Sequence, residues 1–199
     1  MTLYTQQASQ QEAISERESN KAFEGHKIAL LLATGFDEKA YLTLQKFLRR
    51  SQAFLKLVST DQGLVTSWQG TGWGHNYAVD LPINKALAAD FSMCIIPGGS
   101  RNADKLALSA HTKRFINGFL MSSKPVLTIN EANELFNRLE IEAGSPLENA
   151  VTEPQSNDNR SGAVVRNMTL FQVFEADHAS SGDDITKALD MASSCLYNM

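Results

Sequence analysis

The hydrophobic residues of this chain gather into short apolar runs, each followed by a stretch with helical spacing. The clearest runs are 27–33 (KIALLLA), 54–59 (FLKLVS), 91–96 (FSMCII) and 125–129 (PVLTI). Continuous apolar runs of this length are typical of strands that are covered on both faces of a parallel sheet. The pattern therefore predicts buried strands at these four places.

Segments with apolar residues at helical spacing lie between the runs and at the end of the chain. The inner positions are Tyr41, Leu44, Phe47 and Leu48 in one segment, Phe115, Ile116, Phe119 and Leu120 in the next, and Ile185, Leu189, Ala192 and Leu196 in the last. Asp37 and Glu38 stand in the first turn of the first helix, and Ser181 with Asp184 forms a capping box that begins the last one. Alternating strands and helices predict right-handed crossovers and a doubly wound, mostly parallel sheet with helices on both faces.

Smaller elements are expected between these units. The segments 64–68 and 77–80 flank the glycine-rich stretch 69–76 (QGTGWGHN), which predicts a small β-hairpin, and Asp80 and Pro82 are expected to begin a short helix. The segments 163–166 and 169–176, separated by Asn167, are expected to pair as strands.

Two polar segments frame the domain organisation. Residues 1–25 are rich in Gln, Ser and Glu, and are expected to form a flexible arm because they hold too little apolar surface to offset their ordering entropy. Residues 144–162 are polar and rich in turn formers, which predicts a long loop. We therefore expect a single domain over 26–199.

Composition narrows the classes of function. A net charge of −4 and a pI near 5.6 over 199 residues exclude the clustered basic surface that a nucleic-acid partner requires. Cys94 and Cys195 form no CxxC spacing, and the chain has neither an apolar run of membrane-spanning length nor a signal-peptide pattern at its N-terminus. A cytoplasmic protein that does not bind membranes is the expectation.

The most informative turn is KPVLTINEANELF, residues 124–136. An apolar run ends at Ile129, Asn130 follows, and a helix-like stretch begins at once. Many α/β enzymes hold a nucleophile on such a strand-to-helix turn, where backbone N–H groups of the helix assist it. An amide is not a nucleophile of that kind, whereas Asn tolerates the strained backbone of such a turn better than most residues.

Five fragments stand in an order that resembles the DJ-1/PfpI superfamily, also called ThiJ/PfpI or class I glutamine amidotransferase-like, over 27–196. They are GFDEKA, WGHNYAVD, IIPGGSRNADKL, KPVLTI and VVRNMTLFQVFEA. The resemblance implies a flavodoxin-like fold and assembly as a homodimer or higher homo-oligomer, with no cofactor. The segment VFEADHAS, 173–180, is also similar to the C-terminal domain of large-subunit catalases, which has the same fold and lacks the elbow cysteine.

The resemblance also implies positions for the family's chemistry. The acidic residue of the family aligns with Asp37, or with Glu38 if the alignment is shifted by one residue. Its cysteine falls on Asn130, and the position after the cysteine falls on Glu131. Because an amide cannot form the covalent adduct of a thiolate, we expect a non-catalytic domain that serves oligomerisation, partner binding or stress-related regulation. The alternative is a hydrolase or lyase of the same type with relocated acid/base chemistry, carried by Asp37, Glu38 or Glu131.

A ligand pocket is expected beside this turn. Glu38, Gly98, Gly99 and Asn130 are its expected binding residues, since glycine N–H groups would face the turn. No metal is expected, because His75 and His178 stand at no metal-ligand spacing from the carboxylates. Cys94 is expected to be buried in a strand. Trp68 and Trp73 are expected to pack within the hairpin, and the alternative is that they line a surface pocket or a partner contact.

Overall fold

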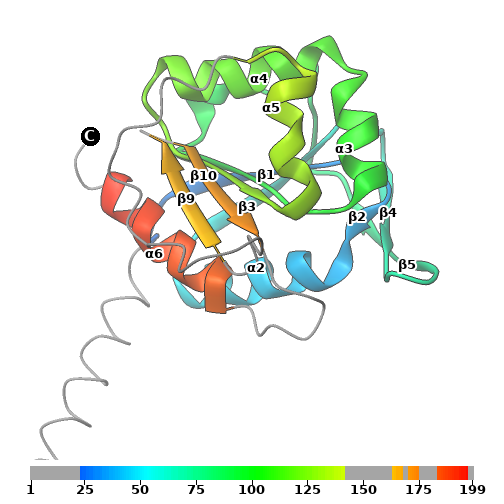
Figure 1. The fold of residues 1–199 in the computed structure, drawn as a ribbon, viewed down its shortest axis with the longest axis horizontal. Coiled ribbons are helices and arrows are strands. Elements are labelled where there is room, and N and C mark those ends of the chain that lie inside the picture. Colours follow the sequence, from blue (N-terminus) through cyan, green and yellow to red (C-terminus); the bar gives the residue numbers. More distant parts are fainter. Residues whose placement is uncertain (1–22, 142–162, 168–169, 175–182, 197–199) are drawn as a thin grey trace, which may run out of the picture.

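The computed structural model describes residues 23–141, 163–167, 170–174 and 183–196. Its centre is a seven-stranded sheet with helices on both faces (Figure 1). The strands, in their order across the sheet, are β6 (Leu81–Pro82), β3 (Phe54–Ser59), β1 (Lys27–Leu32), β7 (Met93–Ile96), β8 (Val126–Ile129), β10 (Leu170–Phe174) and β9 (Ala163–Asn167). All neighbours are parallel except β10 and β9, so the predicted doubly wound, mostly parallel sheet is confirmed.

Successive side chains of β1 point to opposite faces of the sheet and divide the core into two halves. Ile28, Leu30 and Leu32 lie in one hydrophobic cluster, and Ala29 and Leu31 lie in the other. This is why the run 27–33 is apolar throughout: each face is covered by helices.

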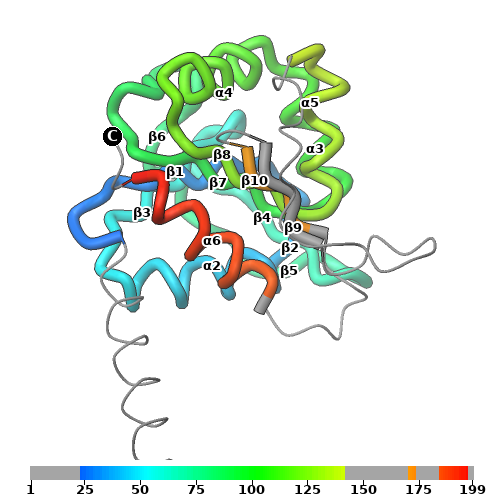
Figure 2. Tube along the Cα trace, turned by 60° about the vertical axis from the view of Figure 1, so that its left-hand side comes forward, coloured from blue at the N-terminus to red at the C-terminus, as the bar shows by residue number. Residues whose placement is uncertain are grey.

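Helices fill both faces. The first face is covered by α2 (Glu38–Arg50) and α6 (Asp183–Leu196), which lie side by side in Figure 2, and the second by α3 (Ser100–Ala107), α4 (Ala110–Met121) and α5 (Leu135–Arg138). The inner stripes predicted for α2, α4 and α6 are buried, apart from Phe47 and Leu120, which are partly buried. The sequence did not separate α3 from α4. The break lies at Leu108 and Ser109, between the two helices.

A second, three-stranded sheet replaces the simple hairpin that was expected. Its order is β2 (Phe36–Asp37), β4 (Leu64–Trp68) and β5 (Trp73–Ala78). The prediction that the second strand starts at Tyr77 is wrong, because β5 begins at Trp73 and takes in half of the glycine-rich stretch. Gly74 fits a strand there because a Cβ on it would overlap Ser67 Oγ of the neighbouring strand.

The helix expected from Asp80 and Pro82 is also wrong. Leu81 and Pro82 form β6, which pairs with β3 at one edge of the large sheet, where a proline is tolerated. The next helical segment is the short 3₁₀ helix η1 (Ala88–Asp90).

Several predictions lie outside the described residues. They concern most of the arm 1–25, the loop 144–162, the cap at Ser181, His178 and the segment 175–180. Within the part of the chain that the structure describes, none of the helices has the length and apolar character needed to cross a membrane.

Candidate functional site

The candidate site lies where the carboxyl ends of β1, β7 and β8 meet, which is the usual place for ligands in open α/β sheets. The turn after β1 contacts the turn after β7 closely, since Asp37 N–H donates to Gly98 O at 2.9 Å. Gly99 has φ 112°, and a Cβ on it would lie 2.6 Å from Gly35 O. Glycine is therefore required at position 99 by both backbone conformation and space.

The turn after β8 has the predicted elbow geometry. Asn130 has φ 51°, in the left-handed region, directly between Ile129 of β8 and the 3₁₀ helix η2 (Asn130–Glu134). Glu131, the next residue, turns its carboxylate toward the neighbouring loop, where Oε2 accepts a hydrogen bond from Gly99 N–H at 2.8 Å. A Cβ on Gly98 would lie 2.9 Å from the same oxygen, so the close approach depends on glycine there too.

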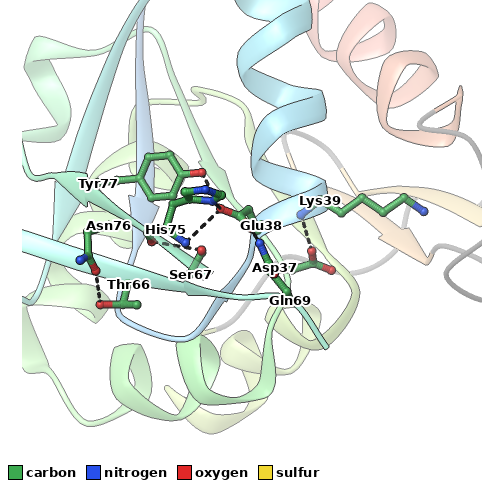
Figure 3. A network of polar contacts seen from close by, with 9 residues as sticks. All are labelled: Asp37, Glu38, Lys39, Thr66, Ser67, Gln69, His75, Asn76 and Tyr77. Carbon is green, nitrogen blue, oxygen red and sulfur yellow. Dashed lines mark hydrogen bonds and ion pairs between the residues drawn. The ribbon is translucent and has the colours of Figure 1, made fainter. Parts of the chain in front are cut away.

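Glu38, the first residue of α2, has a buried carboxylate at the centre of a polar cluster (Figure 3). Oε1 accepts from Tyr77 OH at 2.8 Å and from His75 N–H at 3.3 Å, and lies 2.7 Å from His75 Nδ1. Oε2 accepts from Gln69 Nε2. Both oxygens are thus engaged by side chains and backbone of β5 and of the residue that follows β4.

These contacts fix the charge of Glu38. Burial alone would raise its pKa, but the hydrogen bonds from Gln69, Tyr77 and His75 favour the ionised form and together lower the pKa to about 2. The reciprocal effect falls on Tyr77, whose pKa is raised by burial and by the neighbouring carboxylate. At neutral pH Glu38 is a structural anion without a proton to give.

Asp37 has a different role from its neighbour. It is the N-cap of α2, and its Oδ1 accepts from Lys39 N–H at 2.8 Å and from Ala40 N–H at 3.3 Å. Capping of this kind satisfies helix donors that would otherwise have no partner. The two acids that the sequence could not tell apart are therefore separated: Asp37 caps the helix, and Glu38 faces the hairpin.

A cleft of about 740 Å³ opens beside this cluster. Four of the predicted site residues line this cleft: Asp37, Glu38, Gly99 and Glu131. The other two, Gly98 and Asn130, are not among its lining residues. The remaining lining residues are Lys39, Leu42, Thr43, Trp68, Gln69, Gly70, Thr71 and Ser100. The cleft is therefore shared between the start of α2, the β4–β5 turn and the loop after β7.

An aromatic pair stands at the rim of the cleft. Trp68 and Trp73 meet edge to face with ring centroids 5.3 Å apart, as the prediction of packing within the hairpin requires. The guanidinium of Arg101 lies over the Trp68 ring at 3.9 Å. No local pattern predicts this cation–π contact, because Arg101 and Trp68 come from different elements.

Two buried asparagines, which the sequence analysis did not single out, hold the loops of the site. Asn102 accepts from Ala33 N–H at 2.7 Å and donates to Pro97 O at 2.8 Å, which ties the turn after β1 to the turn after β7. Asn133 accepts from Thr128 Oγ1 at 2.6 Å and donates to Val173 O at 2.9 Å, which ties η2 to β8 and β10. Both asparagines lie in segments quoted in the sequence analysis, but the sequence does not show that they are buried or which groups they bind.

The remaining candidates lie apart from the elbow. Cys94 is fully buried in β7, as predicted, and burial raises the pKa of its thiol. His75 contacts Glu38 rather than a set of metal ligands, and in the described ranges no three His, Cys, Asp or Glu side chains form a group that could hold a metal ion. Cys195 lies in α6, partly exposed.

The fold and this arrangement define a doubly wound α/β protein with a strand-to-helix elbow at the carboxyl edge of its sheet. The chain belongs to the DJ-1/PfpI family, whose model matches residues 26–144. No curated protein matches the sequence.

Solved structures of low sequence identity share the fold. The VC2308 protein is 18% identical with a TM-score of 0.67, over 87% of this chain and 90% of that one. A mutant of a DJ-1 superfamily protein from Salmonella typhimurium is 21% identical with a TM-score of 0.64, over 86% and 91%. A two-domain protein from Anabaena variabilis, with DJ-1/ThiJ/PfpI-like and ferritin-like domains, is 15% identical with a TM-score of 0.66 over 86% of this chain, which spans 48% of its length.

Proposed function

We propose that this chain is a non-catalytic DJ-1/PfpI domain, a pseudoenzyme that acts through oligomerisation or partner binding, with stress-related regulation as the setting that the family resemblance suggests. The observation that carries the proposal is the residue at the elbow. Asn130 has the left-handed backbone of the turn (φ 51°) but presents an amide, whose nitrogen is conjugated to its carbonyl and does not attack carbon. The resemblance of the segment 173–180 to the C-terminal domain of large-subunit catalases stays an expectation from the sequence, and it would suit such a role.

The surroundings of the elbow support the same proposal. In an acyl-transfer site, backbone N–H groups stabilise the oxyanion that develops during reaction. Gly99 N–H already donates to the carboxylate of Glu131, so the chain carries its own anion at this donor. A substrate oxyanion would have to displace Glu131 and would meet its negative charge.

The alternative, a hydrolase or lyase with relocated acid/base chemistry, needs a carboxyl group that exchanges a proton near neutral pH. Glu38 is the buried carboxylate next to the cleft, and its pKa is lowered to about 2. A general base with so low a pKa is weak, and a general acid would be deprotonated. The low pKa of Glu38 therefore argues against the alternative for this carboxylate.

The test is turnover by the purified full chain of methylglyoxal, a peptide and an isocyanide, with an active relative as the positive control. We expect no turnover above buffer for the wild type, Asn130→Ala and Glu38→Gln. Turnover by the wild type that is lost in Asn130→Ala would overturn the proposal. Turnover lost in Glu38→Gln alone, while circular dichroism shows that this variant is still folded under the assay conditions, would support the relocated chemistry instead.

A further inference from the structure

His75 differs from the other histidines of the described ranges in what its ring contacts. Its Nδ1 lies 2.7 Å from Glu38 Oε1, yet 77% of its side chain is exposed (Figure 3). Of the other two histidines in these ranges, His26 has its Nδ1 3.0 Å from Ser92 Oγ, and His111 is exposed in α4 with no carboxylate against its ring. An exposed imidazole held by a buried carboxylate is therefore particular to position 75 in the part of the chain that the structure describes.

The contact fixes which ring nitrogen carries the hydrogen. Glu38 is ionised at neutral pH, and an ionised carboxylate only accepts hydrogen bonds. Nδ1 of His75 must therefore be the protonated nitrogen, so the neutral ring carries its lone pair on Nε2. The carboxylate does not contact Nε2, and the exposure of the side chain leaves this nitrogen open to solvent.

The fold does not need the imidazole in order to hold Glu38. Tyr77 OH donates to Oε1 at 2.8 Å, and Gln69 Nε2 donates to Oε2. The main-chain N–H of His75, which any residue except proline would supply, also donates to Oε1 at 3.3 Å. These donors engage both oxygens without the ring. What the ring adds is an oriented nitrogen lone pair at the protein surface.

We propose that His75 Nε2 is a phosphoryl acceptor, a modification site to which a phosphoramidate donor transfers its phosphoryl group. The Nε2 lone pair forms the new N–P bond, while the N–P bond of the donor breaks and its electron pair leaves with the donor nitrogen. Nδ1 keeps its hydrogen, so no proton moves within the chain. The ring takes a positive charge in this step, and the carboxylate of Glu38 lies beside it to balance that charge.

A phosphoryl group suits this nitrogen better than an acyl group. Transfer from a phosphoramidate exchanges one N–P bond for another and leaves a modified chain. An acyl group on Nε2 would pass to water, and its repeated release would amount to turnover, which the proposed function excludes. The inference goes beyond that function, because His75 does not line the cleft and is modified once per chain. The modification adds about two negative charges to β5, close to the exposed Trp73, where a binding partner can sense them.

The first test treats the purified full chain with potassium phosphoramidate and follows phosphoryl incorporation at each histidine by mass spectrometry. His111 is the reference within the same molecule, because it is exposed and has no carboxylate against its ring. We expect the wild type to react about tenfold or more faster at His75 than at His111. His75→Gln should lose the fast reaction and keep the slow one. Equal rates at the two histidines of the wild type would overturn the proposal.

The second test asks whether Glu38 is the positioning residue. In Glu38→Gln, shown by circular dichroism to be folded, the rate at His75 should fall to that at His111. Tyr77→Phe is the matched control, because it removes a donor from the same oxygen of Glu38 but keeps the carboxylate against Nδ1, and it should keep the fast reaction. A preference for His75 that survives in folded Glu38→Gln would contradict this role.

The third test needs no variant and applies even if Glu38→Gln does not fold. Nitrogen NMR of the wild-type chain distinguishes a protonated ring nitrogen from an unprotonated one. In the neutral ring of His75 we expect the hydrogen on Nδ1 and none on Nε2. A neutral ring with its hydrogen on Nε2 would remove the lone pair on which the proposal depends and would overturn it. Because turnover is measured separately, each of these results leaves the absence of catalysis to its own test.

Discussion

The two sides of the cleft hold their carboxylates in opposite ways. Glu38 is buried, and four donors from one residue after β4 and two residues of β5 engage both of its oxygens. Glu131 is exposed, and Gly99 N–H donates to its carboxylate. A buried anion whose two oxygens both accept hydrogen bonds stabilises the fold and is removed from proton chemistry. An exposed anion that accepts a single hydrogen bond within the described residues contributes little to stability.

Under the proposed function, the difference explains how a family scaffold keeps its shape without the family's chemistry. The Glu38 side carries the stability of the small sheet, since the carboxylate joins α2 to β5. The elbow side carries the left-handed backbone at Asn130, a conformation that asparagine tolerates better than most residues. Substitutions on the two sides of the cleft should therefore differ in their cost to stability.

The largest effect is expected for Glu38→Gln. An amide keeps the shape but loses the charge, and it presents an NH₂ group to donors that need an acceptor, so the free energy of unfolding should fall by about 2–3 kcal/mol. Chemical denaturation followed by circular dichroism measures it. Glu131→Gln is the matched control on the other side of the cleft and should cost less than about 1 kcal/mol. Equal losses of unfolding free energy in the two variants would contradict the difference between the two sides of the cleft.

Gly74→Ala should have the next largest effect. Its Cβ would overlap Ser67 Oγ and stand 2.7 Å from Glu38 Oε2, so the hairpin must shift away from the buried carboxylate. We expect a loss of about 1–3 kcal/mol in unfolding free energy, typical of overpacking. Gly72→Ala, in the turn just before β5, meets no atom within 4 Å and should be close to neutral. A neutral Gly74→Ala would show that the cluster is looser than described.

The stability of the folded chain at acid pH should also depend on Glu38. Its pKa is lowered from 4.5 to about 2 in the folded chain, so its ionised form contributes stability that is complete above pH 4.5 and is lost as the pH falls toward 2. As the pH is lowered across this window, the midpoint temperature of thermal unfolding should fall more steeply for the wild type than for Glu38→Gln. Parallel curves for the two proteins would mean that the carboxylate gains nothing on folding.

The smallest effect is expected at the elbow. Asn130→Ala should cost about 1 kcal/mol, because alanine tolerates the left-handed backbone less well than Asn, and Asn130→Gly should be close to neutral. Denaturation of both variants measures this. A loss larger in Asn130→Gly than in Asn130→Ala would mean that the amide side chain, rather than the backbone conformation, is what the turn requires.

The sequence predicted the features that depend on local pattern. The strands β1, β7 and β8 are apolar runs because both faces of each are covered, whereas β3 is buried only over residues 57–59. The elbow could be placed at Asn130 because a strand run stops there and a helix pattern begins. The start of β5 was missed because Gly74 and its polar neighbours have the composition of a turn. Their strand conformation depends on Ser67 of β4, across the sheet.

The role of Glu38 could not be predicted from the sequence, for a related reason. Asp37 and Glu38 are adjacent acids at a helix start, and the local pattern suits both equally. What separates them is contact with Gln69, His75 and Tyr77, each more than thirty positions away along the chain. The cation–π contact of Arg101 with Trp68 and the loop bridges of Asn102 are long-range in the same sense.

Carbon-detected NMR can follow the titration of the Glu38 carboxyl directly, with its signal assigned by comparison with Glu38→Gln. We expect a midpoint near pH 2, with the group ionised throughout the neutral range. A midpoint well above the ordinary value of 4.5, close to neutral pH, would give the cleft a working acid and contradict the proposal that this domain is non-catalytic.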